Sequence, residues 1–132
     1  MPILDVEIVS EAEGSAHGAA GADDALEPTL AQRLADGVAA AWGLGPEDVW
    51  VRLRVLPSHR YAESGGTAEG VRPVFVSVLR ARVPHGERLG ADVVSLARAV
   101  AKATGRGVEN VHVLHEPAAA GRLAFGGRLV ES

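Results

Sequence analysis

The chain has 132 residues and no cysteine, which suits one domain with a single hydrophobic core and excludes disulfides and thiolate chemistry. Its formal net charge of −4 and its pI of about 5.7 speak against a nucleic-acid partner, because such proteins carry an excess of basic residues. It has no positively charged start and no apolar run near the ~20 residues of a membrane span, so a cytoplasmic protein with no membrane partner is expected.

The first half of the chain reads as strand, loop, helix and strand. Its first residues alternate between apolar and mixed side chains, which predicts a strand with one apolar face. Apolar residues then recur at helical spacing, with Pro28 in the first turn and Gly43 as the C-terminal stop. The predicted elements are a strand over 2–9, a flexible loop over 11–25, a helix over 26–42, a strand over 49–56 and a turn or short hairpin over 57–66.

The second half follows the same order. A strand is predicted over 72–83, and a helix follows from Leu89 to its stop at Gly105. The next strand spans 110–116, and the chain closes with a segment that contains a Gly-Gly turn.

The two halves also share sequence. GLGPEDVWV (43–51) and GRGVENVHV (105–113) have Gly, Gly, Glu, Val and Val at matching places, and proline begins both halves at Pro2 and Pro73. We therefore predict one domain, 1–132, built from a duplicated β-α-β unit. The two copies of the unit are residues 2–66 and 73–130.

The predicted fold class is α+β. Right-handed crossovers make the two strands of each unit parallel, so two tandem units form a four-stranded mixed sheet with both helices on one face, plus short hairpin strands. One side of strand 49–56 is aliphatic, whereas the other carries Trp50, Arg52 and Arg54. A sheet with only one face covered by helices favours packing against a partner sheet in a homo-oligomer. A ferredoxin-like ligand-binding module has the same element order but an antiparallel register.

Three motifs resemble the tautomerase superfamily, the group of 4-oxalocrotonate tautomerase and macrophage migration inhibitory factor (MIF). They are the MPI start on a strand, the V-x-V strand after a helix, and GRLAFGGRLV with its Gly-Gly. The duplicated chain is similar to the fused members, which include dehalogenases and decarboxylases of 3-carbon acids. The resemblance covers nearly the whole chain except 11–25. It implies a tautomerase/MIF-like fold, a trimer whose sheets face a central axis, no cofactor, and a catalytic amino-terminal proline.

Pro2 would be that proline once Met1 is removed. A free secondary amine is a base, or a nucleophile towards carbonyls, and it is neutral at pH 7 only if it is desolvated or near cations. Pro73 holds the matching place in the second half, but its nitrogen is an amide and cannot act as a base. One proline site per chain is therefore expected. The alternative is that proline merely suits the first residue of a strand.

Four arginines are candidates for holding a substrate carboxylate, because paired guanidinium groups bind carboxylates bidentately. Alternation places two of them on one face of strand 49–56 and the other two on one face at the end of strand 72–83. Their alternative role is a solvated face, or ion pairs between subunits with Asp5 and Glu7. The four are Arg52, Arg54, Arg80 and Arg82.

The resemblance narrows this choice only in part. It places the family's first-strand arginine near Arg82, offset by a residue, which leaves Arg80 and Arg82 both open. It places the family's second-strand arginine at Trp50, which is a departure from the family pattern. Either Arg52 or Arg54 would substitute, or the substrate differs from a dicarboxylate.

Tyr61 and His115 are further candidates. The resemblance matches Tyr61 with an aromatic residue that walls the family's site, and its phenol could donate to a developing enolate or act as an acid. Tyr61 could instead pack the hairpin. His112 and His115 lie three residues apart on a strand, hence on opposite faces, so they cannot jointly chelate and no metal site is expected. His115 could serve as a general acid or activate water, or it could form a polar pair with Glu116 at an interface.

The predicted function is that of a tautomerase or isomerase. Pro2 would move a proton on a small enol or unsaturated keto acid, and arginines would fix the carboxylate. One alternative is a fused-family relative that hydrates, dehalogenates or decarboxylates a 3-carbon acid. The others are a non-catalytic ferredoxin-like binding module and a catalytically silent family member that acts as an interaction subunit.

Overall fold

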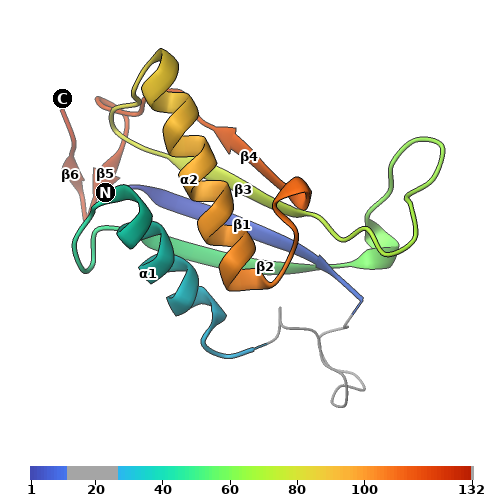
Figure 1. Ribbon diagram of the computed structural model, residues 1–132. Helices are drawn as coiled ribbons and strands as arrows, with labels where there is room; N and C mark the ends of the chain where they lie inside the picture. The colour runs from blue at the N-terminus through green and yellow to red at the C-terminus, as the bar shows by residue number, and fades with distance from the viewer. Residues whose placement is uncertain (12–26, 132) are drawn as a thin grey trace.

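The computed structural model describes residues 1–11 and 27–131, so the predicted loop 11–25 lies, apart from Glu11, outside the described residues. The chain forms two β-α-β units followed by a small hairpin (Figure 1). The elements are β1 (Ile3–Ser10), α1 (Leu30–Trp42), β2 (Trp50–Pro57), the 3-10 helix η2 (Ser58–Arg60), β3 (Val74–Leu79), α2 (Gly86–Thr104), the 3-10 helix η3 (Val108–Asn110), β4 (Val111–His115), β5 (Ala124–Phe125) and β6 (Arg128–Leu129).

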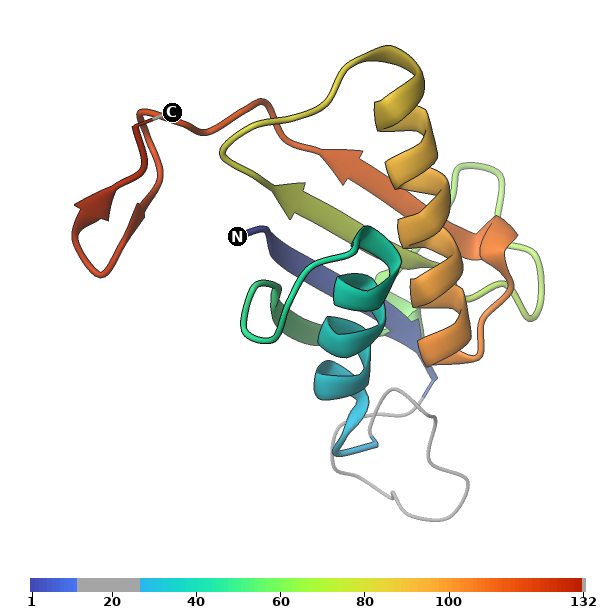
Figure 2. The ribbon, with the colours of Figure 1, turned by 60° about the vertical axis from the view of Figure 1, so that its left-hand side comes forward.

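Four strands form one mixed sheet in the order β2-β1-β3-β4. The pairs β1–β2 and β3–β4 are parallel, whereas β1 and β3 run antiparallel in the middle of the sheet. Both helices cover the same face and leave the other face open (Figure 2). This confirms the predicted fold class. The sheet does not have the antiparallel register of a ferredoxin-like domain.

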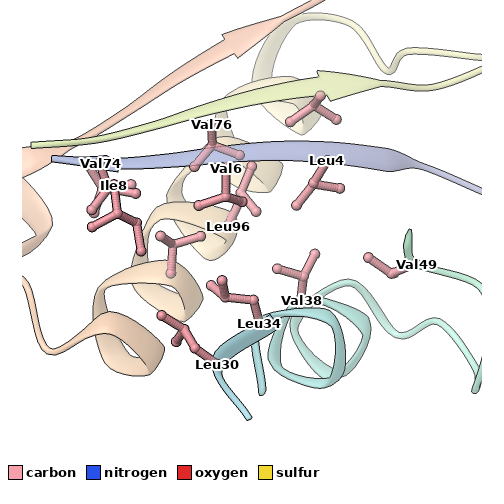
Figure 3. Packing of buried hydrophobic residues seen from close by; sticks show 13 residues of the cluster. Leu4, Val6, Ile8, Leu30, Leu34, Val38, Val49, Val74, Val76 and Leu96 are labelled. Carbon is pink, nitrogen blue, oxygen red and sulfur yellow. The ribbon is translucent and has the colours of Figure 1, made fainter. Parts of the chain in front are cut away.

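The core lies between the sheet and the two helices (Figure 3). Alternate residues of β1 and β3 point toward the helices and are buried, and leucines and valines of α1 and α2 meet them. Because burying one such side chain contributes about 1.5–3 kcal/mol, this layer decides which face of each strand turns toward the helices. Its fully buried members include Leu4, Val6, Ile8, Leu34, Val38, Val74, Val76, Val78, Leu96 and Val100.

The helix ends show what local sequence determines. Gly43 and Gly105 follow the two helices in the left-handed conformation, with φ of 67° and 72°, as predicted for helix stops. The start of α1 differs from the prediction, because the helix begins at Leu30 and Pro28 lies in the turn before it. In that turn the Glu27 carboxylate accepts hydrogen bonds from the backbone N–H and the hydroxyl of Thr29.

The end of β3 requires a correction. The strand predicted over 72–83 stops at Leu79, so Arg80 and Arg82 lie in the connection to α2 and not on one face of a strand. Beyond Leu79, the carbonyl of Arg80 accepts a hydrogen bond from the N–H of Ala119, at 2.9 Å. The chain leaves the sheet here because its backbone finds partners in the segment that follows β4.

The uncovered face of the sheet has two different halves. On β1 and β2, Asp5 lies opposite Arg52 and Glu7 lies opposite Arg54. On β4, Leu114 is 61% exposed. The valines of β2 pack on the helix side instead, so the aliphatic side of strand 49–56 belongs to the core.

Candidate active site

Pro2 is buried at the beginning of β1. Its carbonyl accepts a hydrogen bond from the backbone N–H of Trp50, at 3.1 Å, so the pairing with β2 already begins at this residue. On the other side, Ile3 lies opposite Leu79 of the antiparallel β3. This register brings Arg80, the next residue after β3, alongside Pro2.

Arg80 is held on the helix side of the sheet by two contacts. Its Nη1 donates a hydrogen bond to Oδ2 of Asp92 on α2, at 3.0 Å. Its guanidinium carbon lies 4.4 Å from the ring centroid of Trp42, the last residue of α1. The Trp42 indole in turn donates from Nε1 to the backbone carbonyl of Asp92, at 3.1 Å. The Arg80 side chain is only 20% exposed, so the fold presents a fixed, partly desolvated cation near Pro2.

His115 completes this group at the end of β4. It faces Val78 of β3 in the register of the sheet, and its ring centroid lies 6.5 Å from that of Trp42. Both ring nitrogens are buried, and neither has a hydrogen-bond partner among the described residues. Burial and then the Arg80 cation lower the pKa of His115, so its imidazole is neutral at pH 7.

Tyr61 lies at the opposite end of the sheet. It follows η2, beyond the far end of the eight-residue strand β2, which is about 25 Å long at 3.3 Å per residue (Figure 1). Its hydroxyl donates a hydrogen bond to the Glu63 carboxylate at 2.5 Å, which raises the pKa of Tyr61. Its ring lies 5.8 Å from that of Phe75. Within one chain, therefore, Tyr61 and Pro2 are not brought together.

The two arginines of β2 lie on the uncovered face. Arg52 forms a forked ion pair with Asp5, with contacts of 2.6 and 2.8 Å, and this hydrogen bonding lowers the pKa of Asp5. Asp5 is one of the two acids that we considered as partners of these arginines in ion pairs between subunits. The Arg52–Asp5 pair, however, forms within one chain. Arg54 is exposed and lies opposite Glu7. Neither side chain points to the helix side, where Arg80 is held.

Trp50 joins the end of the sheet that holds Pro2 to the C-terminal hairpin. The Trp50 ring meets that of Phe125 edge to face, with centroids 5.0 Å apart. The hairpin β5–β6 turns at Gly126 and Gly127, both at positive φ, and projects beyond the sheet (Figure 2). A hollow of about 680 Å³ between α1 and β2 also reaches Trp50.

The predicted site residues are thus spread over several places. Pro2, Arg80 and His115 form a first group at one end of the sheet, where Trp50 also lies but on the uncovered face. Tyr61 lies beyond the other end, and the remaining arginines lie on the uncovered face (Arg52, Arg54) or in the connection after β3 (Arg82). Trp42 and Asp92 also belong to the first group, although the sequence places Trp42 only in the apolar stripe of its helix and carries no signal for Asp92. Trp42 and Asp92 are 50 residues apart in the sequence, and they meet because α1 packs on α2.

Two general findings bear on the kind of site. Within residues 1–11 and 27–131, no group of three or more His, Asp or Glu side chains is placed to hold a metal ion. No helix in the same part of the chain is long and apolar enough to cross a membrane.

Solved structures that match nearly the whole chain identify the fold. A fused 4-OT, a wild-type symmetric trimer, is 19% identical with a TM-score of 0.61, over 97% of this chain and 94% of its own. Pt0534 inactivated by 2-oxo-3-pentynoate is 19% identical with a TM-score of 0.66, over 97% and 94%. The macrophage migration inhibitory factor of Trichinella spiralis is 9% identical with a TM-score of 0.66, over 96% and 98%.

The chain therefore has the fold of the fused 4-OT and MIF structures. The motifs of the sequence predict this fold. No family model matches the sequence, and no curated protein matches it either.

Proposed function

We propose that the protein is a cofactor-independent tautomerase in which Pro2 acts as the general base on a small enol or unsaturated keto acid. One observation carries this proposal: a buried residue Pro2 lies beside Arg80, a cation held in place by Asp92 and Trp42. The likeness in fold to fused 4-OT and MIF structures supports it.

The chemistry requires Met1 to be removed, since only then is the Pro2 nitrogen a secondary amine. Burial disfavours the charged form of that amine, and so does a neighbouring cation. The neutral amine would take a proton from the substrate and return it at another carbon, while Arg80 binds the carboxylate. The same guanidinium would stabilise negative charge that develops on the enolate oxygen.

The other predicted site residues fit this proposal to different degrees. Trp50 would wall the site together with Phe125, and His115 lies beside Trp42, the residue that also contacts Arg80. Arg54 and Tyr61 would contribute only from a neighbouring copy, because they lie away from Pro2 in their own chain. Arg52 is paired with Asp5, and Arg82 is exposed in the connection after β3.

A homo-oligomer would supply such a neighbour. One face of the sheet has no helix over it, and Leu114 stands exposed on that face. A sheet face that no helix covers leaves room for a sheet of another copy. A fused 4-OT of the same fold is a trimer, so we infer that this chain also forms a trimer.

The test of the catalytic role compares the two equivalent prolines. Mass spectrometry first establishes whether Met1 is removed. Pro2→Ala is expected to lower kcat/KM on 2-hydroxymuconate or phenylenolpyruvate by about 10²–10⁴-fold, the usual contribution of a general base. Pro73→Ala is the matched control and is expected to keep the activity, because the Pro73 nitrogen is an amide.

A Pro2→Ala protein with full activity would contradict the proposal. Labelling with 2-oxo-3-pentynoate, which inactivated Pt0534, gives a second measurement. One equivalent per chain, located at Pro2 by peptide mass, is expected. If only haloacrylates or other 3-carbon acids are turned over, and this also depends on Pro2, the reaction is hydration, dehalogenation or decarboxylation and not tautomerisation.

A further inference from the structure

We propose that His115 is a positioning residue for Arg80. While the His115 ring is neutral, the Asp92 carboxylate binds Arg80 alone. When protonated, the ring competes for that carboxylate and loosens the cation beside Pro2. The half of this inference that concerns substrate rests on the proposed function, whereas the half that concerns the Arg80–Asp92 contact does not.

The first argument is the environment of the His115 ring. Its two nitrogens are shielded from water and have no partner in the described part of the chain. A buried donor or acceptor without a partner is unfavourable, so a ring in this position favours any rearrangement that supplies a hydrogen bond. Its ring is tilted against that of Trp42, and the Arg80 guanidinium lies over the same Trp42 ring.

The second argument is the set of charges that act on the ring. From the end of β3 the Arg80 cation opposes an imidazolium, and from α2 the Asp92 carboxylate favours it. Trp42 of α1 brings a ring face but no charge. Directly after β4 comes Glu116, whose backbone N–H donates to the carbonyl of Val78. Protonation would therefore create a second cation that attracts the same carboxylate, Asp92, that now holds Arg80.

The direction of the pH effect follows from these contacts. Burial and Arg80 lower the pKa of His115, so at neutral pH the ring is uncharged and the Arg80–Asp92 pair is intact. As the pH falls through the lowered pKa, the ring becomes charged and Arg80 loses part of its anchorage. The affinity for a carboxylate substrate would fall, which raises KM. Protonation of the Pro2 amine, in contrast, would lower kcat as well.

The kinetic test uses the two histidines of β4, which lie on opposite faces of one strand. His115→Phe keeps an aromatic ring but cannot titrate. His112→Phe is the control, because His112 is exposed on the uncovered face, with its ring 5.5 Å from Phe75. As the pH is lowered from about 8 through the midpoint of the His115 titration, the wild type and His112→Phe are expected to show a KM that rises at least about fivefold, and His115→Phe a KM that stays flat. An equal rise in His115→Phe would overturn the proposal.

A second readout does not depend on catalysis. In a Trp50→Phe background the remaining tryptophan, Trp42, reports on His115, because a protonated imidazole at this distance quenches indole emission. A drop in emission with a midpoint below the ordinary histidine value of about 6.5 is expected, and it should vanish in His115→Phe. Should that variant not fold, His115→Gln serves in its place.

The two readouts separate the two hypotheses. If the emission titrates in a protein that has no tautomerase activity, and its midpoint is lower in Asp92→Asn, the proposed function fails and the coupling of His115 to the Arg80–Asp92 pair stands. If the emission titrates and KM does not change in an active enzyme, the substrate half of the inference is wrong. If the emission does not titrate, the coupling itself is overturned.

Discussion

Pro2 and Arg80 illustrate that the chemistry of a side chain depends on neighbours that are remote in sequence. Arg80 is a candidate from the sequence because an anionic substrate needs a guanidinium group. What fixes it in place is Asp92, twelve residues further on, and Trp42 from the other half of the chain. A strand pattern cannot reveal these partners, since it describes alternation along one element only.

The Arg80–Asp92 contact leads to a prediction at the scale of single residues. Asp92→Asn removes the carboxylate and leaves Arg80 without its ion pair in a partly buried place. KM is expected to rise about fivefold to tenfold, and the free energy of unfolding is expected to fall by about 1 kcal/mol, the range for a partly exposed pair. Steady-state kinetics and urea denaturation measure the two effects.

Asp36→Asn is the control for that variant. Asp36 is exposed on α1, where it accepts a hydrogen bond from Gln32, and it lies outside the Arg80 group. Its replacement should leave KM unchanged. An Asp92→Asn protein with the KM of the wild type would show that the ion pair does not position Arg80 for substrate.

At the scale of elements, most of the fold is readable from the sequence because each element shows its own period. The strands alternate, the helices have an apolar stripe, and glycine ends both helices. The end of β3 could not be predicted from the strand pattern. Beyond Leu79 the backbone pairs with a distant segment, because the N–H of Ala119 donates a hydrogen bond to the carbonyl of Arg80. The role of Tyr61 stays a prediction for a similar reason: a motif match shows which residue corresponds, but not whether it meets the Pro2 of its own chain or of another copy.

The packing of α2 on the sheet allows a prediction about stability. Leu96 is fully buried between α2 and the sheet, so Leu96→Ala should lower the free energy of unfolding by about 3 kcal/mol through lost burial and the cavity left behind. Val94 lies on the same helix but is 48% exposed, and Val94→Ala should change it by less than about 1 kcal/mol. Urea denaturation of both variants is the measurement. Similar losses would mean that α2 does not bury the face described.

At the scale of the whole molecule, the antiparallel pairing of β1 and β3 places the starts of the two halves at opposite ends of one sheet. Pro2 therefore lies at one end, whereas Pro73 lies at the other, where its carbonyl accepts a hydrogen bond from Val9. The two ends have become different. The Pro2 end has Arg80 alongside, and the matching place beside Pro73 is taken by the apolar Val9.

If the uncovered face of the sheet is the contact between copies, a charge placed on it should dissociate the oligomer. Leu114→Asp replaces the exposed leucine of this face by a charge and is expected to convert the proposed trimer to a monomer in analytical ultracentrifugation. Val108→Asp is the control, because Val108 is also exposed but lies in η3, before the sheet. A Leu114→Asp protein that sediments like the wild type would exclude this face as the contact between copies.

The buried start of β1 has a practical consequence for anyone who produces this protein. Any expression tag or leftover cleavage residue in front of Pro2 would join its nitrogen in a peptide bond, and Pro2 would then be chemically the same as Pro73. The other end of the chain has no such restriction, because the residues of β6 are exposed. Purification handles should therefore follow the hairpin, or an inactive preparation would say nothing about the enzyme.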